Sequence, residues 1–209
     1  MKRILIADDH HVVRNGLKHV LADEFSEIEF GEAQDSSEVL QKMKEGIWDI
    51  VILDINMPGR NGLDVLCQMK AENNKTPVLV LSMLAEDQIA VRVLKLGAFG
   101  YLSKDAPNEE LIKAIHQILS GKRYITPSLA EQIAIQLENP LNKAQHEFLS
   151  EREYQTLILI ARGKTVSHIA DELSISTPTV STYRARILEK MHMKNNADLM
   201  NYAFRNNLV

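Results

Sequence analysis

Three acidic residues stand where short apolar segments of the chain end. Asp54 closes the apolar run 50–53, and Asp8 and Asp9 follow the segment 3–7. Three carboxylates brought together repel one another, so at least one would be driven toward its neutral form unless a cation joined them. Oxygen-only ligands favour Mg²⁺, which keeps several waters and leaves room for a phosphate oxygen. The pattern therefore indicates a magnesium site.

Two more polar residues follow apolar segments in the same way. Ser82 ends the segment 77–82, and Lys104 comes directly after the segment 99–103. A carboxylate can form an aspartyl phosphate when a metal neutralises the incoming group, and Asp54 is the best nucleophile candidate. Lys104 would place a point charge on a phosphoryl oxygen, and Ser82 would add a hydrogen bond. A single Asp is more often a cap or turn residue, but the complete set indicates phosphoryl chemistry.

These segments alternate with segments of helical periodicity. The predicted strands are residues 3–7, 28–33, 49–54, 77–82 and 99–103, and the predicted helices are residues 12–22, 36–45, 62–72, 86–97 and 108–120. This alternation predicts an α/β fold, a five-stranded doubly wound parallel (βα)5 sheet with helices on both faces. Open parallel sheets bind ligands beyond the carboxyl ends of their strands, so we expect the five polar residues at one rim.

Four stretches of this half resemble the receiver domain of bacterial response regulators: ILIADDHHVVRNGL, DIVILDINMPGRNGLDVL, PVLVLSM and GAFGYLSKDAPNEELIKAI. The resemblance covers residues 1–120. It implies that Asp54 is the phosphoacceptor. It also implies that Asp9, Asp54 and the main-chain carbonyl of Asn56 bind Mg²⁺, and that Asp8 acts on the ion largely through water.

The same resemblance implies which groups respond to the phosphate. Ser82 and Lys104 would bind the phosphoryl group, and Tyr101 matches the aromatic residue that turns inward when Ser82 moves. A sensor histidine kinase would supply the phosphoryl group from a phosphohistidine. The modification adds close to two negative charges, and the surface formed by the fourth helix and the fifth strand would repack in response.

Two histidines follow the first acids. His10 and His11 begin the first predicted helix, where adjacent residues diverge by about 100°. We therefore leave both out of the predicted metal site and expect capping or surface roles.

The alternation ends at Gly121. Residues 121–146 indicate a linker with a helix at about 128–138, and a helix this short is marginal in water, so we expect it to dock on a domain. Residues 147–209 predict a small all-α domain. Its four predicted helices are residues 150–163, 166–174, 177–191 and 196–207.

A tight turn separates the second and third of these helices, which is the helix-turn-helix arrangement whose second member can enter the DNA major groove. If Val180, Ile187 and Met191 form the buried stripe, the opposite side of the third helix faces outward. The same spacing also fits a surface helix in a protein-binding bundle. The residues that we expect to contact DNA are Thr179, Ser181, Thr182, Tyr183, Arg184, Arg186 and Lys190.

This half resembles the LuxR-type domain of the NarL/FixJ regulators, over LSEREYQTLILIARGKTVSHIADELSISTPTVSTYRARILEKMHMKNNADLMNYA. The resemblance implies a transcription factor that binds double-stranded DNA as a homodimer when active. Positions 181 and 185, often Lys or another polar residue in relatives, are Ser and Ala here, so an operator sequence cannot be transferred. The last helix, with Leu199, Tyr202 and Ala203 on one side, is our candidate pairing surface, and intradomain core is the alternative for Leu199.

Charge and composition narrow the partners. Residues 1–120 carry 13 basic and 19 acidic residues, a net charge of −6, whereas residues 121–209 carry 11 and 9, a net charge of +2. The acidic part suits cations, and the mildly basic part is compatible with nucleic acid without establishing it. No apolar run approaches the roughly 18 residues of a membrane helix, and the first residues do not form a signal-peptide core. We expect a cytoplasmic protein without a membrane partner.

We interpret the chain as a phosphorylation-controlled transcription regulator of a two-component system. It would be no enzyme beyond Mg²⁺-dependent self-phosphorylation from a phosphodonor and slow autodephosphorylation. A metal-dependent phosphohydrolase is the first alternative, but its signature places an acid two residues after the nucleophile, where this chain has Asn56, and no GxxxxGK loop is present. A binding module that switches without phosphorylation is the second, and the complete set of acids, hydroxyl and ammonium disfavours it.

Overall fold

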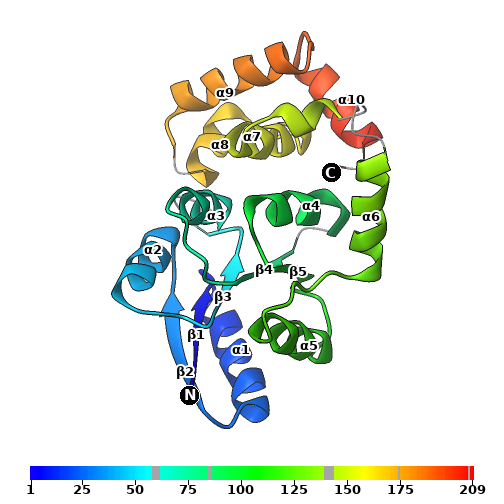
Figure 1. Cartoon of the computed structure of the whole chain (residues 1–209). Helices are drawn as coiled ribbons and strands as arrows, with labels where there is room; N and C mark the ends of the chain where they lie inside the picture. Colours follow the sequence, from blue (N-terminus) through cyan, green and yellow to red (C-terminus); the bar gives the residue numbers. More distant parts are fainter. Residues whose placement is uncertain (58–61, 84–85, 139–143, 174, 207) are drawn as a thin grey trace. The chain divides into compact units, whose positions relative to one another are not determined.

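The chain is seen in a computed structural model that describes all residues except 58–61, 84–85, 139–143, 174 and 207 (Figure 1). It divides into two compact units, Met1–Ile133 and Ala134–Val209. Among the described residues, no helix has the length and apolar character needed to cross a membrane.

The first unit is built on a parallel sheet with the strand order β2-β1-β3-β4-β5. The strands are β1 (Lys2–Ala7), β2 (Ile28–Ala33), β3 (Ile50–Asp54), β4 (Val78–Ser82) and β5 (Gly100–Ser103). Each boundary lies within one residue of its predicted position. The strand order reverses between β1 and β3, and a crevice at such a point is where open α/β sheets bind their ligands.

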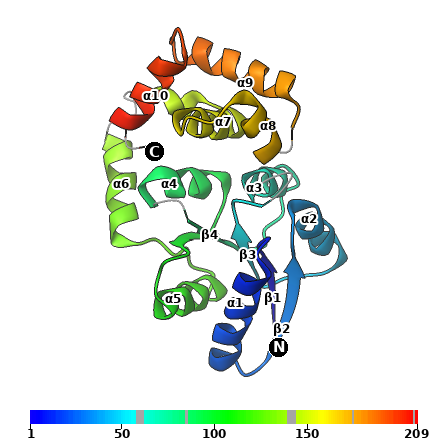
Figure 2. The same ribbon diagram turned by 180° about the vertical axis from the view of Figure 1, so that it is seen from behind.

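Helices cover both faces of the sheet (Figures 1 and 2). They are α1 (His11–Glu24), α2 (Ser36–Glu45), α3 (Gly62–Ala71), α4 (Glu86–Leu96) and α5 (Asn108–Leu119). Helices α1 and α5 contribute to one buried cluster, and α2, α3 and α4 contribute to the other. The predicted doubly wound α/β architecture is therefore confirmed.

The strands alternate their side chains between these two clusters. In β1, Ile4 and Ile6 point toward α1 and α5, whereas Leu5 and Ala7 point toward the other layer. All five residues of β3 are buried, as the continuous apolar run requires. Asp54, the last of them, is therefore a charged residue at the edge of a closed core.

One aromatic side chain closes the layer over β2. The indole ring of Trp48 lies so near Gly31 that a Cβ atom there would come within 2.3 Å of it, so a larger residue at this position would displace the ring. Its Nε1 donates to the Lys42 carbonyl oxygen at 3.0 Å. The Arg3 guanidinium lies 4.6 Å from the ring centroid on the same indole.

The helix expected in the linker is α6 (Pro127–Glu138), and the boundary between the two units falls within it. Leu129 is fully buried in the cluster formed by α2, α3 and α4, and Ile133 packs against the same cluster. The first half of α6 therefore docks on the first unit, as expected for a helix too short to be stable alone.

The second unit is helical throughout its described part. A 3-10 helix, η1 (Gln145–Phe148), precedes α7 (Glu151–Ala161), α8 (Val166–Glu172), α9 (Thr177–Lys190) and α10 (Asn196–Arg205). Ser150 and Glu153 form the predicted capping box of α7, and Ser176 caps α9. The four helices enclose their own apolar core, which confirms the predicted all-α domain.

Candidate functional site

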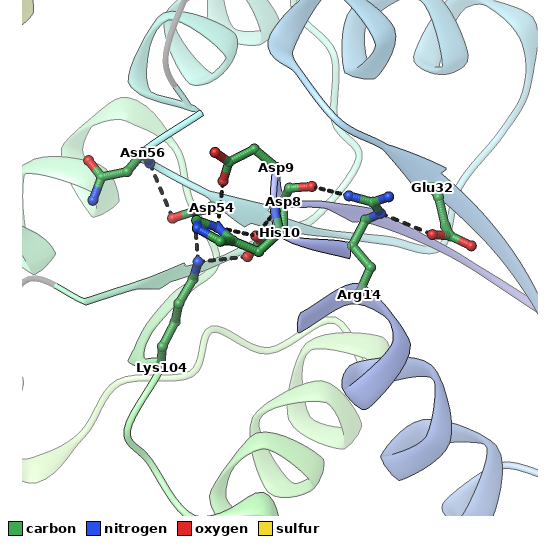
Figure 3. Close-up of polar contacts among 8 residues, drawn as sticks. All are labelled: Asp8, Asp9, His10, Arg14, Glu32, Asp54, Asn56 and Lys104. Atoms are coloured by element: carbon green, nitrogen blue, oxygen red, sulfur yellow. Dashed lines mark hydrogen bonds and ion pairs between the residues drawn. The ribbon is translucent and has the colours of Figure 1, made fainter. Parts of the chain in front are cut away.

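The acidic rim is formed where β1 and β3 end. Asp8 follows β1 and Asp54 ends β3, and each is only 2% exposed. Lys104, which follows β5, reaches both of them (Figure 3). Its Nζ lies 2.8 Å from Asp54 Oδ2 and 2.6 Å from Asp8 Oδ2. The structure thus brings together side chains from three strands that are far apart in the sequence.

Asp9 and His10 complete this cluster. His10 Nδ1 lies 2.7 Å from Asp9 Oδ1 and 3.3 Å from Asp8 Oδ1. One ligand atom from each of Asp8, Asp9, His10 and Asp54 fits within 4.8 Å. The sequence argument that excluded His10 assumed helical geometry, but His10 is the N-cap of α1 with an extended backbone. Its side chain therefore does not follow the helical phase and points toward the acids.

The electrostatics of the cluster favour a divalent cation. Burial raises the pKa of the Asp54 carboxyl, and the hydrogen bond from Lys104 opposes this rise. Burial also opposes the charge of Lys104, but its bonds to Asp54 and Asp8 prevail and raise the pKa of the ammonium. Three carboxylates and one ammonium leave a charge of −2 without His10. The oxygen donors and this charge fit Mg²⁺.

The other predicted residues of the rim lie around Asp54. The Asn56 N–H donates to Asp54 Oδ1 at 3.1 Å. Ser82 is fully buried at the end of β4, and its carbonyl oxygen accepts the Lys104 N–H at 2.8 Å. Tyr101 on β5 is also fully buried, within the layer that contains α4. Ser82 and Tyr101 therefore lie on the neighbouring strands β4 and β5, and α4 packs against β5.

Gly62 permits the start of α3 to approach the end of β3, which carries Asp54. The Gly62 N–H donates to the Ile55 carbonyl oxygen at 2.9 Å, so α3 begins directly against the end of β3. A Cβ atom on Gly62 would lie 2.3 Å from the Asp54 carbonyl oxygen, which is closer than real contacts allow. Any larger residue at this position would therefore displace the strand end that carries Asp54.

Sequence reasoning missed Arg14. Its side chain on α1 is buried, and it bonds the Asp8 carbonyl oxygen and the Glu32 carboxylate. The available signal was a cation placed within a helical segment close behind the acids, but helical periodicity alone does not distinguish it from a surface residue.

The exposed face of α9 follows the predicted phase. Val180, Ile187 and Met191 are buried in the core of the second unit. Ser181 and Arg186 are exposed on the opposite side, together with Thr182. The Ser181 and Thr182 hydroxyls donate to carbonyl oxygens one turn earlier in the helix, at 3.0 Å each.

The remaining candidates on α9 have partners inside the domain. Lys190 Nζ lies 2.6 Å from Glu153 Oε2, although part of the lysine side chain remains exposed. Arg184 Nε donates to Asn196 Oδ1 at 2.6 Å, and the Thr179 N–H donates to the side chain of the N-cap residue Ser176. Tyr183 is half-buried. Arg186 and Lys190 are thus the exposed cations among the predicted DNA-contacting residues of α9, and Lys190 is held in its ion pair with Glu153.

Two of the three residues of the predicted pairing surface on α10 belong to the core, which was the stated alternative for Leu199 and is a correction for Ala203. Leu199 and Ala203 are fully buried in the core of the second unit, because the stripe faces α7 rather than solvent. Tyr202 is half-buried, and its hydroxyl lies 2.9 Å from His146 Nδ1. The apolar residues that α10 exposes are Met200 and Phe204, and Phe204 is 76% exposed.

Family models match both units. Residues 4–116 match the model of the response regulator receiver domain, and residues 147–203 match that of the bacterial regulatory proteins of the luxR family. The chain is a response regulator. Regulators with this pair of domains, the NarL/FixJ type, are DNA-binding proteins of two-component systems rather than classical enzymes.

Curated relatives match this regulator over its whole length. The response regulator GacA of Pseudomonas viridiflava is 36% identical over 210 residues, covering 100% of this chain and 98% of that protein. The response regulator UvrY of Escherichia coli K12 is 32% identical over 209 residues, covering 100% and 96%. Both alignments therefore span the two units of this chain.

Solved structures of RcsB resemble the regulator as well. RcsB from Salmonella enterica serovar Typhimurium, bound to promoter rprA in the presence of phosphomimetic BeF3−, has a TM-score of 0.67 and 25% identity, covering 96% of this chain and 97% of that chain. An RcsB–DNA complex has a TM-score of 0.59 and 26% identity, covering 97% and 98%. These likenesses extend over both units of the regulator.

Proposed function

We propose that this regulator is switched by transfer of a phosphoryl group to Asp54 and that the switch controls binding of α9 to double-stranded DNA. The observation that carries the proposal is the convergence of Asp54, Asp8 and Lys104 from three strands. A buried ion cluster is weak evidence for stability, because removing charges from water costs about as much as their attraction returns. Chemistry is therefore the better explanation for it.

In the transfer, an Asp54 carboxylate oxygen attacks the phosphorus of a phosphohistidine on a sensor kinase. A P–O bond forms, the P–N bond breaks, and the imidazole leaves with its bonding electrons and takes up a proton. Lys104 exchanges a carboxylate oxygen for a phosphoryl oxygen, and Ser82 donates a hydrogen bond to another. These groups act on charge that arrives only with the phosphate.

Mg²⁺ would be held by Asp9, Asp54 and the main-chain carbonyl of Asn56, with Asp8 acting largely through water. When bound, the ion supplies charge neutralisation for the incoming phosphoryl group. Asn56 offers no carboxylate to activate water, so hydrolysis of the acyl phosphate should be slow. The regulator would therefore catalyse its own phosphorylation with Mg²⁺ and would lose the phosphoryl group only slowly.

The response would run from the rim through β4 and β5. Movement of the buried Ser82 toward the phosphate leaves space beside the strand that carries Tyr101, and the surface of α4 and β5 repacks. This repacking would release or pair the second unit.

The regulator works in the cytoplasm, where kinase domain and DNA are both available to it.

The exposed face of α9 is the proposed DNA-recognition surface. Arg186, Ser181 and Thr182 are placed to reach base edges, whereas Arg184, Lys190, Thr179 and Tyr183 lie at its margins and suit the backbone. The solved structure of an RcsB–DNA complex supports this use of the second unit. Active regulator would bind as a homodimer, and Met200 and Phe204 on α10 are now the better candidates for the pairing surface.

Phosphorylation is tested by incubating the full chain with Mg²⁺ and a small acyl phosphate, and then weighing it. A stable gain of one phosphoryl group is expected for the parent and no gain for Asp54→Asn. Asp64→Asn, which removes an acid from α3 rather than from the rim, is the matched control. Labelling that persists in Asp54→Asn would refute the assigned acceptor.

DNA binding is tested by footprinting the phosphorylated protein on genomic fragments. Protection of paired half-sites, with centres about 10 bp or a multiple of this apart, is expected for a two-fold dimer. Protected sites without repeated half-sites, bound equally well by a monomer, would overturn the dimer.

A further inference from the structure

Arg14 is a charged side chain in an almost closed environment. It lies in the first turns of α1 and is 5% exposed. A buried guanidinium is tolerated only where hydrogen bonds and an opposite charge compensate it. Here Nη1 donates to the Asp8 carbonyl oxygen at 2.7 Å, and Nε donates to Glu32 Oε2 at 3.0 Å (Figure 3).

The Asp8 carbonyl oxygen, which accepts the bond from Arg14, lies just beyond the end of β1. Pairing between β1 and β3 ends at Ala7, so Asp8 is the first residue beyond that ladder. The Asp8 N–H still donates to the Ala33 carbonyl oxygen on β2, at 3.1 Å. The bond from Arg14 therefore fixes the Asp8 peptide from its other side, just where the chain turns and presents Asp8 and Asp9.

Glu32 balances the positive charge of Arg14. It accepts Arg14 on one carboxylate oxygen and Lys18 on the other, and both cations lower the pKa of Glu32, Lys18 having the larger effect. Arg14 touches the main chain of Asp8 but has its ion pair with Glu32. It can therefore hold the turn through a main-chain bond while its ion pair is with Glu32, outside the rim.

We propose that Arg14 is a positioning residue for the metal. It holds the Asp8–Asp9 turn in a geometry that can receive Mg²⁺, and it acts through the Asp8 peptide rather than by touching the ion. The inference rests on the proposed function, since it assigns a residue to the metal site of the phosphoryl transfer. Outer partners of ligand groups typically change metal affinity by about 10- to 100-fold, and Arg14 belongs at the lower end because it contacts main chain.

The test measures Mg²⁺ binding directly by titration calorimetry and compares it with the Mg²⁺ dependence of phosphorylation by a small acyl phosphate. Arg14→Gln should raise the Mg²⁺ dissociation constant and half-saturation concentration by roughly tenfold while the rate at saturating Mg²⁺ stays close to that of the parent. Arg14→Lys keeps a cation but cannot donate to both partners as the guanidinium does. Its Mg²⁺ dissociation constant should therefore lie between those of the parent and Arg14→Gln. A general loss of structure would instead lower the saturated rate.

Lys18→Gln is the matched control, because it removes the other cation on Glu32 and leaves the Asp8 carbonyl bond in place. It should bind Mg²⁺ within about twofold of the parent. Equal effects of Lys18→Gln and Arg14→Gln, or an unchanged dissociation constant in both Arg14 variants, would overturn the positioning role. If Arg14→Gln does not fold, Arg14→Lys carries the comparison with Lys18→Gln. A parent protein that binds no Mg²⁺ would overturn the proposed function together with this inference.

Discussion

The acidic rim and the exposed face of α9 hold their polar side chains in opposite ways. At the rim, Asp8 and Asp54 are nearly inaccessible, and Lys104 joins them across three strands. On α9, Arg186 is exposed, whereas Arg184 and Lys190 turn back to partners within their own domain. The rim groups are already paired with one another, whereas the proposed DNA-contacting face of α9 leaves Arg186 open to solvent. The two regions should therefore differ in what single changes do to them.

Metal removal should have the largest effect, and only at the rim. A chelator should reduce phosphorylation from a small acyl phosphate on the order of a hundredfold or more, because the carboxylates then repel the donor. Basal DNA affinity of unphosphorylated protein, measured by fluorescence anisotropy, should not change. Chelation that weakens this basal affinity would show that the two regions are not independent in this respect.

Changes on α9 should come next. Arg186→Ala should cost about 1–3 kcal/mol in DNA binding, since the side chain proposed to read a base is lost. Lys190→Ala should weaken binding less and should lower the free energy of unfolding by about 1 kcal/mol, because it leaves the Glu153 carboxylate without its cation. Affinity measured over a salt series, together with urea unfolding, separates the two. The reverse order of effects would show that Lys190 leaves Glu153 when DNA binds.

Ser82→Ala should have a smaller effect and should separate modification from response. The variant should still accept the phosphoryl group on Asp54. Its gain in DNA affinity on phosphorylation should be about fivefold smaller than that of the parent, the equivalent of one hydrogen bond of about 1 kcal/mol. Anisotropy with equally phosphorylated samples measures this difference. Matching affinities would exclude a route through the Ser82 hydroxyl.

The smallest effect should appear in acid, within the second unit. Burial opposes the charge of Glu153, but bonds from Lys190 and Ser150 prevail and place the pKa of Glu153 below its ordinary value of 4.5. The stability that this carboxylate contributes is therefore present above about pH 4.5 and is lost as the pH falls through the folded-state pKa. The free energy of unfolding, measured with urea at several pH values, should therefore fall less steeply toward low pH in Glu153→Gln than in the parent. An unchanged fall toward low pH would contradict the ion pair with Lys190.

The sequence predicted the rim well because parallel strands constrain their ends. The apolar runs set the strands, the strands share a direction, and Asp8, Asp54 and Lys104 must therefore emerge on one side. His10 was left out of the predicted metal site by an argument from helical phase, but it lies beside the acids because it is the N-cap of α1 and has an extended backbone. Arg14 was missed because only the fold brings it against its partners, the main-chain carbonyl of Asp8 and the carboxylate of Glu32 on β2.

On α9, periodicity predicted which residues are buried but not what the long side chains do. The phase from Val180 to Met191 is set by packing, and it was correct. Lys190 and Arg184 have several rotatable bonds, so nearby acceptors on α7 and α10 decide where their charges lie. The same limit applies to α10, where Leu199 and Ala203 form a stripe that is equally suited to a core and to a dimer surface. Only the packing of α7 against α10 distinguishes these uses.

The packing of Trp48 over Gly31 also gives the protein a built-in optical probe. Trp48 is the only tryptophan of the chain and belongs to the unit Met1–Ile133. Intrinsic emission excited at long ultraviolet wavelengths therefore reports melting of the sheet unit alone, whereas circular dichroism reports helices from both units. Loss of the indole contact on β2 would change the emission, while melting of α7 to α10 would leave it unchanged. The two transitions can thus be followed in the intact chain without an added fluorophore.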